Sequence, residues 1–296
     1  MTPNIWIITV IYSNTQDELS DLINSVKKMD YQNYSLLLIN NGPTQPWHNS
    51  LLANIPNSQF INNPNGNTGY AGGNNVGIHH AINHGADYIL LLNPDTTVKP
   101  TLLKDLLECF SKDKNIGLAL PIITFPDKKK VWYAGGYTSR VWGFTRSPGI
   151  NHQLPPSIQD RYVSFAPTCC ALVSTRALQQ TGFFDESYFL YFEDTALNFS
   201  LVKHGYKLYF HAKHLVTHNK KSTKLSPLEA YYYGRNPFIL IRQHFSWPLN
   251  WTAYLGQFII RLPRNILRVQ NTKALIQYLI GIKDGILGKT GKHWPA

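Results

Sequence analysis

The sequence predicts an α/β fold: a mostly parallel sheet flanked by helices, followed by a helical C-terminal appendage. Up to about residue 120, short apolar runs alternate with helical patterns, which is typical of parallel strands joined by crossover helices. Residues 88–92 are apolar or aromatic throughout, as expected for a strand buried on both faces. Beyond about residue 226 the chain is rich in Tyr, Trp and basic residues at helical spacing. We therefore predict a first domain at 1–225 and a helical region at 226–296.

The first domain begins with four predicted strands and the helices between them. The strands are expected at 5–12, 35–40, 58–62 and 88–92, and the helices at 16–29, 75–84 and from Pro100 to about Ser111. Asn74 or Asn75 can cap the start of the second helix, and Gly85 can end it in a left-handed turn. Ligands of parallel sheets bind at the carboxyl ends of strands, where Asn93-Pro94-Asp95 follows the fourth strand.

The rest of the chain is expected to be less regular at first. Residues 126–162 are rich in Gly, Pro, aromatic and basic residues without periodicity, which indicates an irregular, mobile excursion able to close over a site. A strand at 170–173, helices near 175–181 and 193–204, and a short strand at 207–210 then follow. The appendage should contain three helices, at about 226–245, 249–268 and 273–287.

The composition indicates a globular chain with a basic surface. A length of 296 residues and 43% hydrophobic content suffice for a sizeable core. Lys and Arg outnumber Asp and Glu by 28 to 17, a net charge of +11 that favours phosphates, nucleic acid or an anionic bilayer as binding partners.

Three cysteines bear on the compartment. Cys109 stands alone and Cys169 adjoins Cys170, which argues against a disulfide framework and a zinc site and favours a reducing cytosol. The apolar run at the N-terminus has no basic segment before it, so we interpret it as a buried strand and not as a signal peptide. No run reaches the roughly 18–20 apolar residues that a membrane span requires.

A glycine-rich segment at residues 65–75 precedes the second predicted helix. Its four glycines would let backbone N–H groups approach a phosphate or a nucleoside closely. The spacing is neither that of the dinucleotide fingerprint nor that of a P-loop. A ligand-binding loop and a plain strand-to-helix turn both remain open.

Asn93 and Asp95 are candidates for binding a metal ion. A hard divalent ion that bridges two phosphates needs few protein ligands, because phosphate and water oxygens supply the rest. The alternative is an Asx turn. A second ligand must come from elsewhere, and His218, followed by two lysines, is the favoured candidate. His211 and His214 remain alternatives, and many histidines are purely structural.

Glu193 and Asp194 are candidates for acid–base chemistry. They follow the aromatic run 188–192, which would exclude water from a carboxylate and raise its pKa, as a general base requires. The alternative is an acidic first helical turn that interacts favourably with the helix dipole.

Taken in order over residues 4–240, the segments resemble the inverting family 2 glycosyltransferases, and among them the rhamnosyltransferase-like branch of bacterial O-antigen and cell-wall polysaccharide synthesis. The segments that carry the resemblance are Val10-Ile11-Tyr12, Asn67 to Ile78, Leu91 to Thr96, Gly182 to Glu186, Leu190 to Asp194, and Tyr233-Gly234-Arg235-Asn236. The resemblance implies a GT-A fold with a mixed, mostly parallel sheet.

The resemblance also implies the roles of individual residues. Asp95 stands in the family's DXD motif and would hold Mg²⁺ or Mn²⁺ against the donor diphosphate, and His218 would complete the metal site. Asp194 would deprotonate the acceptor hydroxyl and Glu193 would help to place the acceptor. The residues implied in binding the donor nucleotide are Val10, Tyr12, Asn40, Gly72, Asn74, Asn93, Asp95 and Arg235.

Two departures from the family pattern concern specificity. Asn40-Asn41 replaces the usual Asp-Asn, although an amide oxygen can still accept the N3–H bond of the base. Ala196 stands where the family tends to carry a further acid, which affects the expected contacts to the acceptor.

The implied reaction is a single in-line displacement that inverts the anomeric carbon of the donor sugar. The resemblance implies dTDP-L-rhamnose as donor, with UDP-galactofuranose and UDP-hexoses as alternatives, and a glycan or an undecaprenyl-diphosphate-linked sugar as acceptor. The enzyme would then be cytoplasmic, at the inner face of the plasma membrane. Basic residues of the appendage suit an interfacial helix on anionic lipid, while packing on the domain or a homodimer contact is the alternative. They are Arg261, Arg264, Arg268, Lys273, Lys283, Lys289 and Lys292.

Two other classes compete with this interpretation. A sugar nucleotidylyltransferase needs a Gly-rich basic loop after its first strand, whereas Ser13-Asn14-Thr15-Gln16 follows here. A non-catalytic carbohydrate- or nucleic-acid-binding protein is favoured by the charge and the 13% aromatic content. Such a binder would not depend on a divalent metal and would not hydrolyse a dTDP-sugar. The enzyme hypothesis, in contrast, involves no nucleic acid as a partner.

Overall fold

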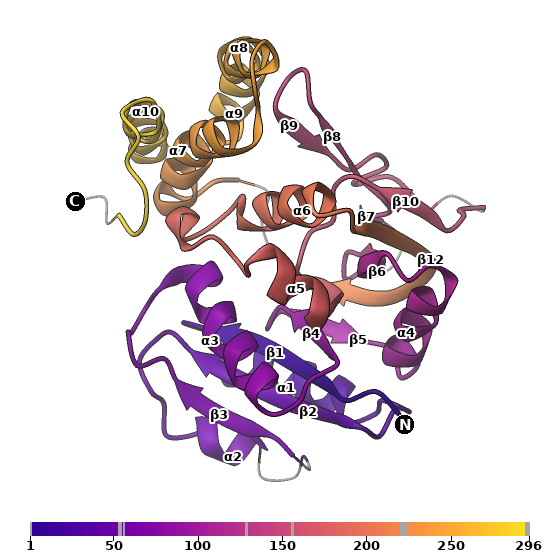
Figure 1. The fold of residues 1–296 in the computed structure, drawn as a ribbon. Coiled ribbons are helices and arrows are strands. Elements are labelled where there is room, and N and C mark those ends of the chain that lie inside the picture. The colour runs from indigo at the N-terminus through magenta and orange to yellow at the C-terminus, as the bar shows by residue number, and fades with distance from the viewer. Residues whose placement is uncertain are drawn as a thin grey trace.

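The computed structural model describes residues 2–52, 55, 57–127, 130–154, 157–219 and 224–293. The described residues form a central ten-stranded sheet with helices on both faces (Figure 1). Its parallel part has the order β3-β2-β1-β4 and consists of β1 (Ile5–Ile11), β2 (Tyr34–Asn40), β3 (Gln59–Asn62) and β4 (Tyr88–Leu92). The four strands expected in the first half of the chain are therefore confirmed.

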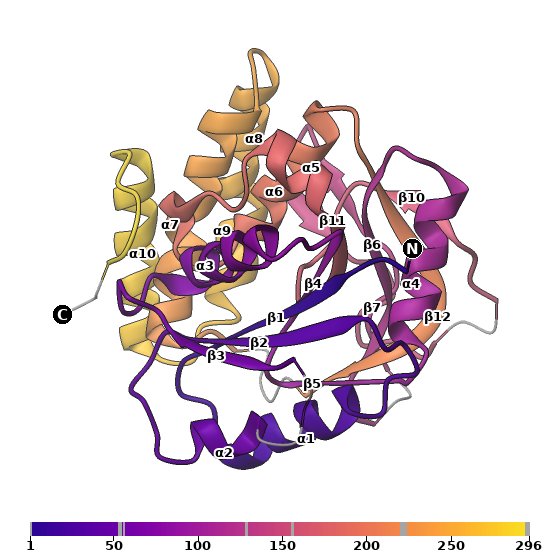
Figure 2. The ribbon, with the colours of Figure 1, turned by 60° about the horizontal axis from the view of Figure 1, so that its bottom comes forward.

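Helices cover both faces of these strands. They are α1 (Gln16–Val26), α2 (His48–Leu52), α3 (Gly69–Asn83) and α4 (Leu102–Lys112). Figure 2 shows α1 and α2 on one face of β1–β3 and α3 on the other. A capping box between Thr15 and Glu18 starts α1, because the threonine side chain accepts from the Glu18 N–H and the glutamate accepts from the Thr15 N–H.

Helix α3 begins earlier than its expected start at 75, so the capping predicted for Asn74 or Asn75 is wrong. The helix follows Thr68, and both asparagines are buried inside it. Its glycines allow close packing on the sheet, since a Cβ on Gly77 would lie 2.6 Å from Cγ2 of Ile8. The glycine-rich segment is thus mostly helix. Gly85 adopts a φ of 75° just after it, as expected.

The second half of the sheet is mixed. It contains β5 (Thr96–Val98), β6 (Ile116–Thr124), β7 (Val131–Tyr133), β10 (Arg161–Val163), β11 (Cys170–Ser174) and β12 (Lys207–His218). Strand β11 runs antiparallel between β4 and β6, and β12 is parallel to β6 and antiparallel to β5.

Two of these strands differ from expectation. Strand β6 was not predicted because Gly117 and Pro121, which are rare inside strands, interrupt its apolar run. Strand β12 continues past the expected end at 210 through polar residues, with register shifts on either side of His214. The longer strand carries His218 to the edge where β4 ends.

The expectation of irregular structure over residues 126–162 is partly wrong. Besides β7 and the start of β10, this segment forms a hairpin of β8 (Tyr137–Ser139) and β9 (Phe144–Arg146). Strands of three residues are too short to produce a recognisable period. The hairpin packs on the C-terminal helices, because a Cβ on Gly256 would lie 2.5 Å from the carbonyl oxygen of Trp142.

The remaining elements are helical. They are α5 (Thr175–Thr181), a 3₁₀ turn (Glu186–Tyr188), α6 (Glu193–Lys203), α7 (Pro227–His244), α8 (Leu249–Gly256), a π-helical turn (Gln257–Arg261), α9 (Leu262–Ile266) and α10 (Thr272–Ile286). The expected C-terminal helices are thus present, and α7 to α10 lie together in Figure 1. Within the described residues, no helix has both the length and the apolar character needed to cross a bilayer.

Helices α7 and α10 pack through glycines. A Cβ on Gly281 would lie 2.1 Å from the carbonyl oxygen of Tyr231, and one on Gly234 would lie 2.4 Å from that of Tyr278. The two helix backbones can approach this closely only because the side chains are absent.

Candidate active site

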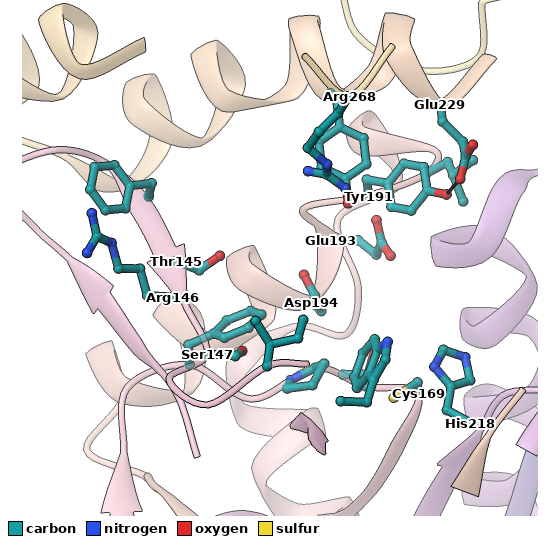
Figure 3. Close-up of a pocket in the computed structure, with 18 of the residues that line it drawn as sticks. Thr145, Arg146, Ser147, Cys169, Tyr191, Glu193, Asp194, His218, Glu229 and Arg268 are labelled. Carbon is teal, nitrogen blue, oxygen red and sulfur yellow. Dashed lines mark hydrogen bonds between the residues drawn. The ribbon is translucent and has the colours of Figure 1, made fainter. Parts of the chain in front are cut away.

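A cavity of about 910 Å³ lies where the sheet, the β8–β9 hairpin and the C-terminal helices meet. Five of the predicted site residues line it together: Asn93, Asp95, Glu193, Asp194 and His218. Figure 3 shows Glu193, Asp194 and His218 around one cavity, with Cys169 between Asp194 and His218. Residues about a hundred positions apart in the sequence therefore share one cavity.

Asp95 and His218 are brought together by strand pairing. His218 ends β12 and is aligned with Thr96, the first residue of β5. Asp95 directly precedes Thr96, so the side chains of Asp95 and His218 meet. Their Nε2 and Oδ1 atoms are 3.0 Å apart. The rings of Trp132 and His218 pack at nearly a right angle, with 4.7 Å between the ring centroids. The pair is thus held at one point of the cavity wall.

The structure distinguishes among the three candidate histidines. His211 lies 3.2 Å from Asp160 through Nδ1, and His214 lies 2.9 Å from the hydroxyl of Thr124. Only His218 of the three lines the cavity in the described part of the chain. The two lysines that follow it, Lys220 and Lys221, lie outside the described residues.

The residues around Asp95 fit a hard divalent ion. Oδ1 of Asn93 is buried and has no hydrogen-bond partner among the described residues, so an acceptor oxygen is left available beside the carboxylate. The described residues contain no cluster of three or more His, Cys, Asp or Glu side chains. An ion held here would therefore need phosphate and water oxygens to complete its coordination.

Glu193 and Asp194 open α6 and form a coupled acidic pair. Burial, followed by the charge of Asp194, raises the pKa of Glu193 well above its ordinary value. Burial also raises the pKa of Asp194 to about 6, although the backbone N–H and the hydroxyl of Thr195 donate to its Oδ1 at 2.6 and 3.1 Å. Glu193 thus tends to stay protonated while Asp194 ionises near neutral pH, which suits a general base.

The backbone before this pair is strained. Phe189, Tyr191 and Phe192 have φ values of 63°, 64° and 74°, a region that L-residues with large side chains rarely adopt. Each such residue costs on the order of 1–3 kcal/mol and persists only where surrounding contacts fix it. The strain aims the first turn of α6, and with it both carboxyl groups, into the cavity.

Helix α7 provides these contacts. The amide nitrogen of Asn236 lies 3.0, 2.8 and 2.7 Å from the carbonyl oxygens of Tyr188, Leu190 and Tyr191. The Arg235 guanidinium, fully buried, donates to the carbonyl oxygens of Ser187 and Tyr188. Arg235 therefore supports the strained turn from outside the cavity lining, and its predicted contact to the donor nucleotide stays a prediction.

Tyr12 and Asn40 lie at the carboxyl ends of β1 and β2, outside the cavity lining. Tyr12 is 47% exposed, and Asn40 bridges Gly42 and Asn62 through its amide group. These strand ends lie at the same edge of the sheet as the end of β4, which is where parallel sheets bind ligands. The contact of Val10, Tyr12 and Asn40 to a nucleoside stays a prediction.

Gly72 and Asn74 lie within α3 and also lie outside the cavity lining. The Asn74 amide donates to the carbonyl oxygen of Tyr70 in the preceding turn. A Cβ on Gly72 would lie 2.5 Å from the Thr68 side chain, so this glycine is needed for packing whether or not a nucleotide binds nearby.

Sequence reasoning missed four arginines that line the cavity: Arg146, Arg261, Arg264 and Arg268. The sequence analysis named the last three for an interfacial helix on anionic lipid, with packing on the domain or a homodimer contact as the alternative. Their spacing of three and four places them on one helix face, which could have indicated a shared target. Arg146 comes from the β8–β9 hairpin, whose sequence gave no comparable signal.

Comparison with known proteins shows the family of the chain. The sequence matches the Glycosyl transferase family 2 over residues 6–182. It is 25% identical to dTDP-rhamnosyl transferase RfbF of Shigella flexneri over 98% of both chains. It is 27% identical to N-acetylglucosaminyl-diphospho-decaprenol L-rhamnosyltransferase of Mycobacterium tuberculosis, over 85% of this chain and 90% of the relative.

A solved structure supports the fold. TarS residues 1–349 of S. aureus superimpose with a TM-score of 0.63 at 14% identity, over 96% of this chain and 80% of the TarS chain. At this identity the likeness concerns the fold alone, and it confirms the expected GT-A architecture. With the family match over more than half of the chain, it removes the nucleotidylyltransferase and the non-catalytic binder from consideration. The chain therefore belongs to glycosyl transferase family 2 and is a glycosyltransferase.

Proposed function

We propose that this glycosyltransferase moves L-rhamnose from dTDP-L-rhamnose to a lipid-linked glycan, with inversion at the anomeric carbon, in the synthesis of a surface polysaccharide. The observation that carries the proposal is the shared cavity of the Asp95–His218 pair and the Glu193–Asp194 pair. The donor sugar is taken from the two relatives, both of which are named as rhamnosyltransferases.

Cys169 lies near both acidic sites, that of Asp95 and that of Asp194. Burial raises the pKa of its thiol first, and the negative charges of neighbouring groups, Asp95 and Asp194 among them, raise it further. One buried sulfur atom is therefore close to both carboxylates. A donor sugar bound over Cys169 would have its diphosphate toward Asp95 and its reacting carbon toward Asp194.

Asp194 accepts the proton of the acceptor hydroxyl in this mechanism. Its raised pKa keeps the carboxylate basic enough to take a proton near neutral pH. The protonated Glu193 beside it can donate a hydrogen bond to the acceptor, because its Oε2 has no partner among the described residues. The hydroxyl oxygen then attacks the anomeric carbon, and the nucleoside diphosphate departs on the opposite side.

Asp95 and His218, with Asn93 beside them, would hold Mg²⁺ or Mn²⁺. When bound, the ion supplies positive charge that stabilises the departing diphosphate. The protein side chains fix the position of the diphosphate at the end of β4, opposite Asp194.

We also propose that the enzyme works at the inner face of the plasma membrane. Large apolar side chains of the C-terminal region are strongly exposed, among them Trp251 (66%), Ile259 (64%) and Leu267 (84%). Exposed apolar residues of a helical region suit the interface of a bilayer. A Trp251→Ser/Leu267→Ser variant should lose flotation with phosphatidylglycerol vesicles. If the exposed residues instead form a homodimer contact, the variant will shift the sedimentation coefficient and leave flotation unchanged.

A donor panel tests the proposed activity. The protein is incubated with Mg²⁺ and with dTDP-, UDP- and GDP-sugars, and release of nucleoside diphosphate is measured without acceptor. We expect release from dTDP-L-rhamnose, its loss in EDTA, and loss of metal-dependent nucleotide binding in Asp95→Ala. Release of nucleoside diphosphate from a UDP-hexose or UDP-galactofuranose alone would show that this compound, and not dTDP-L-rhamnose, is the donor. Turnover without a metal ion would contradict the role of Asp95.

A further inference from the structure

One wall of the cavity carries a cluster of four arginines, Arg146, Arg261, Arg264 and Arg268, which we call the arginine cluster. Arg146 ends β9, Arg261 ends the π-helical turn, Arg264 lies in α9 and Arg268 follows it. The mechanism above uses none of them. Their function is therefore open.

The charges of the cluster are incompletely balanced. In the described part of the chain, Arg146, Arg261 and Arg264 have no carboxylate partner. Burial and then the neighbouring Arg268 and Arg146 lower the pKa of Arg264. Burial lowers the pKa of Arg261 to about 10, and its Nε is buried with no partner among the described residues. Like charges gathered this way favour a bound anion.

The cluster lies on the acceptor side of the base. Figure 3 shows Arg146 on the far side of Asp194 from His218, and Arg268 above Asp194, also away from His218. In an inverting displacement, the attacking group enters on the face of the sugar opposite to the leaving group. If the departing diphosphate lies toward His218, the acceptor must lie toward the arginines. The anion is therefore carried by the acceptor and is separate from the donor diphosphate.

We propose that the arginine cluster binds a phosphate or diphosphate group of the acceptor, so that the enzyme selects a sugar phosphate ester over a neutral glycan. Guanidinium groups bind phosphate oxygens through paired N–H donors, which fixes position as well as charge. The phosphate would hold the acceptor hydroxyl at Asp194. This inference depends on the proposed function, because it assigns the acceptor side from the position of the base.

Binding of inorganic pyrophosphate in EDTA tests the cluster directly. Chelation removes the metal ion, so the Asp95 site should not contribute. We expect calorimetry to show binding by the wild type and by Asp95→Ala, and a loss of affinity of about tenfold for each of Arg146→Gln and Arg264→Gln. Arg176→Gln, an exposed arginine of α5, is the matched control and should bind as the wild type does. Equal affinity of the cluster variants and the wild type would overturn the proposal.

A pair of matched acceptors tests the selection. One is a sugar carried on an octyl diphosphate, and the other is the octyl glycoside of the same sugar. The wild type should have a kcat/KM at least tenfold higher for the diphosphate, Arg146→Gln/Arg264→Gln should lose that preference, and the control Arg176→Gln should keep it. Equal use of both acceptors by the wild type overturns this inference but leaves the proposed function intact.

Two further outcomes separate the remaining explanations. If no donor is turned over at all, the proposed function fails, and pyrophosphate binding still decides whether the cluster holds an anion. Phospholipid headgroups carry the same chemistry, so the double variant is also tested with phosphatidylglycerol vesicles. A tenfold loss of vesicle binding with unchanged acceptor preference would assign the cluster to the membrane and contradict the proposal.

Discussion

Asp194 is partly buried and also lines the cavity, and both features affect how the activity of the enzyme depends on pH. If the carboxylate is the base, kcat/KM should fall about tenfold per pH unit below about pH 6, the pKa to which burial raises it, and level off above. Asp194→Asn should abolish transfer and keep nucleotide affinity. Retained turnover in Asp194→Asn, or a rate that does not change between pH 5 and pH 8, would refute this role.

The same pKa shift predicts that the ionised Asp194 carboxylate destabilises the folded protein. The pKa of Asp194 is raised from 3.8 in the unfolded chain to about 6 in the folded protein, so the folded state binds more protons between about pH 4 and pH 6. The free energy of unfolding therefore falls as the pH rises through this range. Asp194→Asn should therefore raise the free energy of unfolding at pH 8 by roughly 1 kcal/mol, because water in the cavity reduces the full effect. The difference should vanish below about pH 4 in urea titrations.

Asp17→Asn, at an exposed position in the first turn of α1, is the matched control for this measurement and should give no gain in stability at pH 8. If Asp194→Asn were less stable than the wild type at pH 8, burial would not be the dominant effect on this carboxyl group.

At this scale, the sequence indicated four candidate residues that lie at the cavity, but not the groups that support them. Asp95, Glu193, Asp194 and His218 could be found because each follows a buried or aromatic run that places it at the cavity. Arg235 could not be distinguished from a ligand-binding arginine, since its guanidinium finds its partners only in the folded chain, on carbonyl oxygens almost fifty positions away.

Among the elements, the strained turn before α6 depends most on its neighbours. Asn236→Asp keeps the size of the side chain and removes the amide donors that hold the carbonyl oxygens of residues 188, 190 and 191. We expect a loss of about 1–3 kcal/mol in unfolding free energy. The kcat should fall more than the donor KM rises, because the turn aims the base and does not bind the donor.

Asn83→Asp, at the exposed C-terminal end of α3, serves as the control for that substitution; it should leave kcat unchanged and lower stability by less than about 1 kcal/mol, because the carboxylate opposes the helix dipole. A Asn236→Asp variant that is destabilised but keeps the wild-type kcat at low temperature would show that the turn has only a structural role.

The pairing of α7 with α10 offers a second test at this scale. Gly281→Ala places a Cβ 2.1 Å from the carbonyl oxygen of Tyr231, so α10 must move away from α7. We expect the free energy of unfolding to fall by about 1–3 kcal/mol. Because α10 does not line the cavity among the described residues, kcat measured well below the melting temperature should stay within about twofold of the wild type.

Lys283→Ala, at an exposed position of the same helix, should leave the melting temperature nearly unchanged. If Gly281→Ala instead stabilised the protein, as the higher helix propensity of alanine alone would predict, the close approach of α7 and α10 would not set the effect.

Element prediction succeeded where patterns were long. The parallel strands β1 to β4 were found because each contains a run of adjacent apolar residues between helical patterns, whereas β6 was missed because of its internal glycine and proline. The start of α3 was misplaced since glycines usually end helices, yet here they let the helix approach the sheet. The hairpin of β8 and β9 was not predicted because its strands are only three residues long.

For the whole molecule, the sequence predicted the GT-A fold but not how its parts enclose the cavity. The division at residues 225 and 226 remains a prediction. The helices beyond it contribute Tyr233 and the arginines Arg261, Arg264 and Arg268 to the cavity wall. The C-terminal helices are therefore part of the candidate active site and more than an appendage, which no local pattern could indicate.

The central claim is that Asp95 and Asp194 act on one donor sugar from opposite sides of the cavity. A crystal structure with Mn²⁺ and a dTDP-sugar, in the Asp194→Asn variant to prevent turnover, tests it most directly. We expect an anomalous manganese peak beside Asp95 and His218, the diphosphate next to it, and the anomeric carbon facing residue 194. A manganese peak elsewhere, or a donor sugar that points away from residue 194, would contradict the claim.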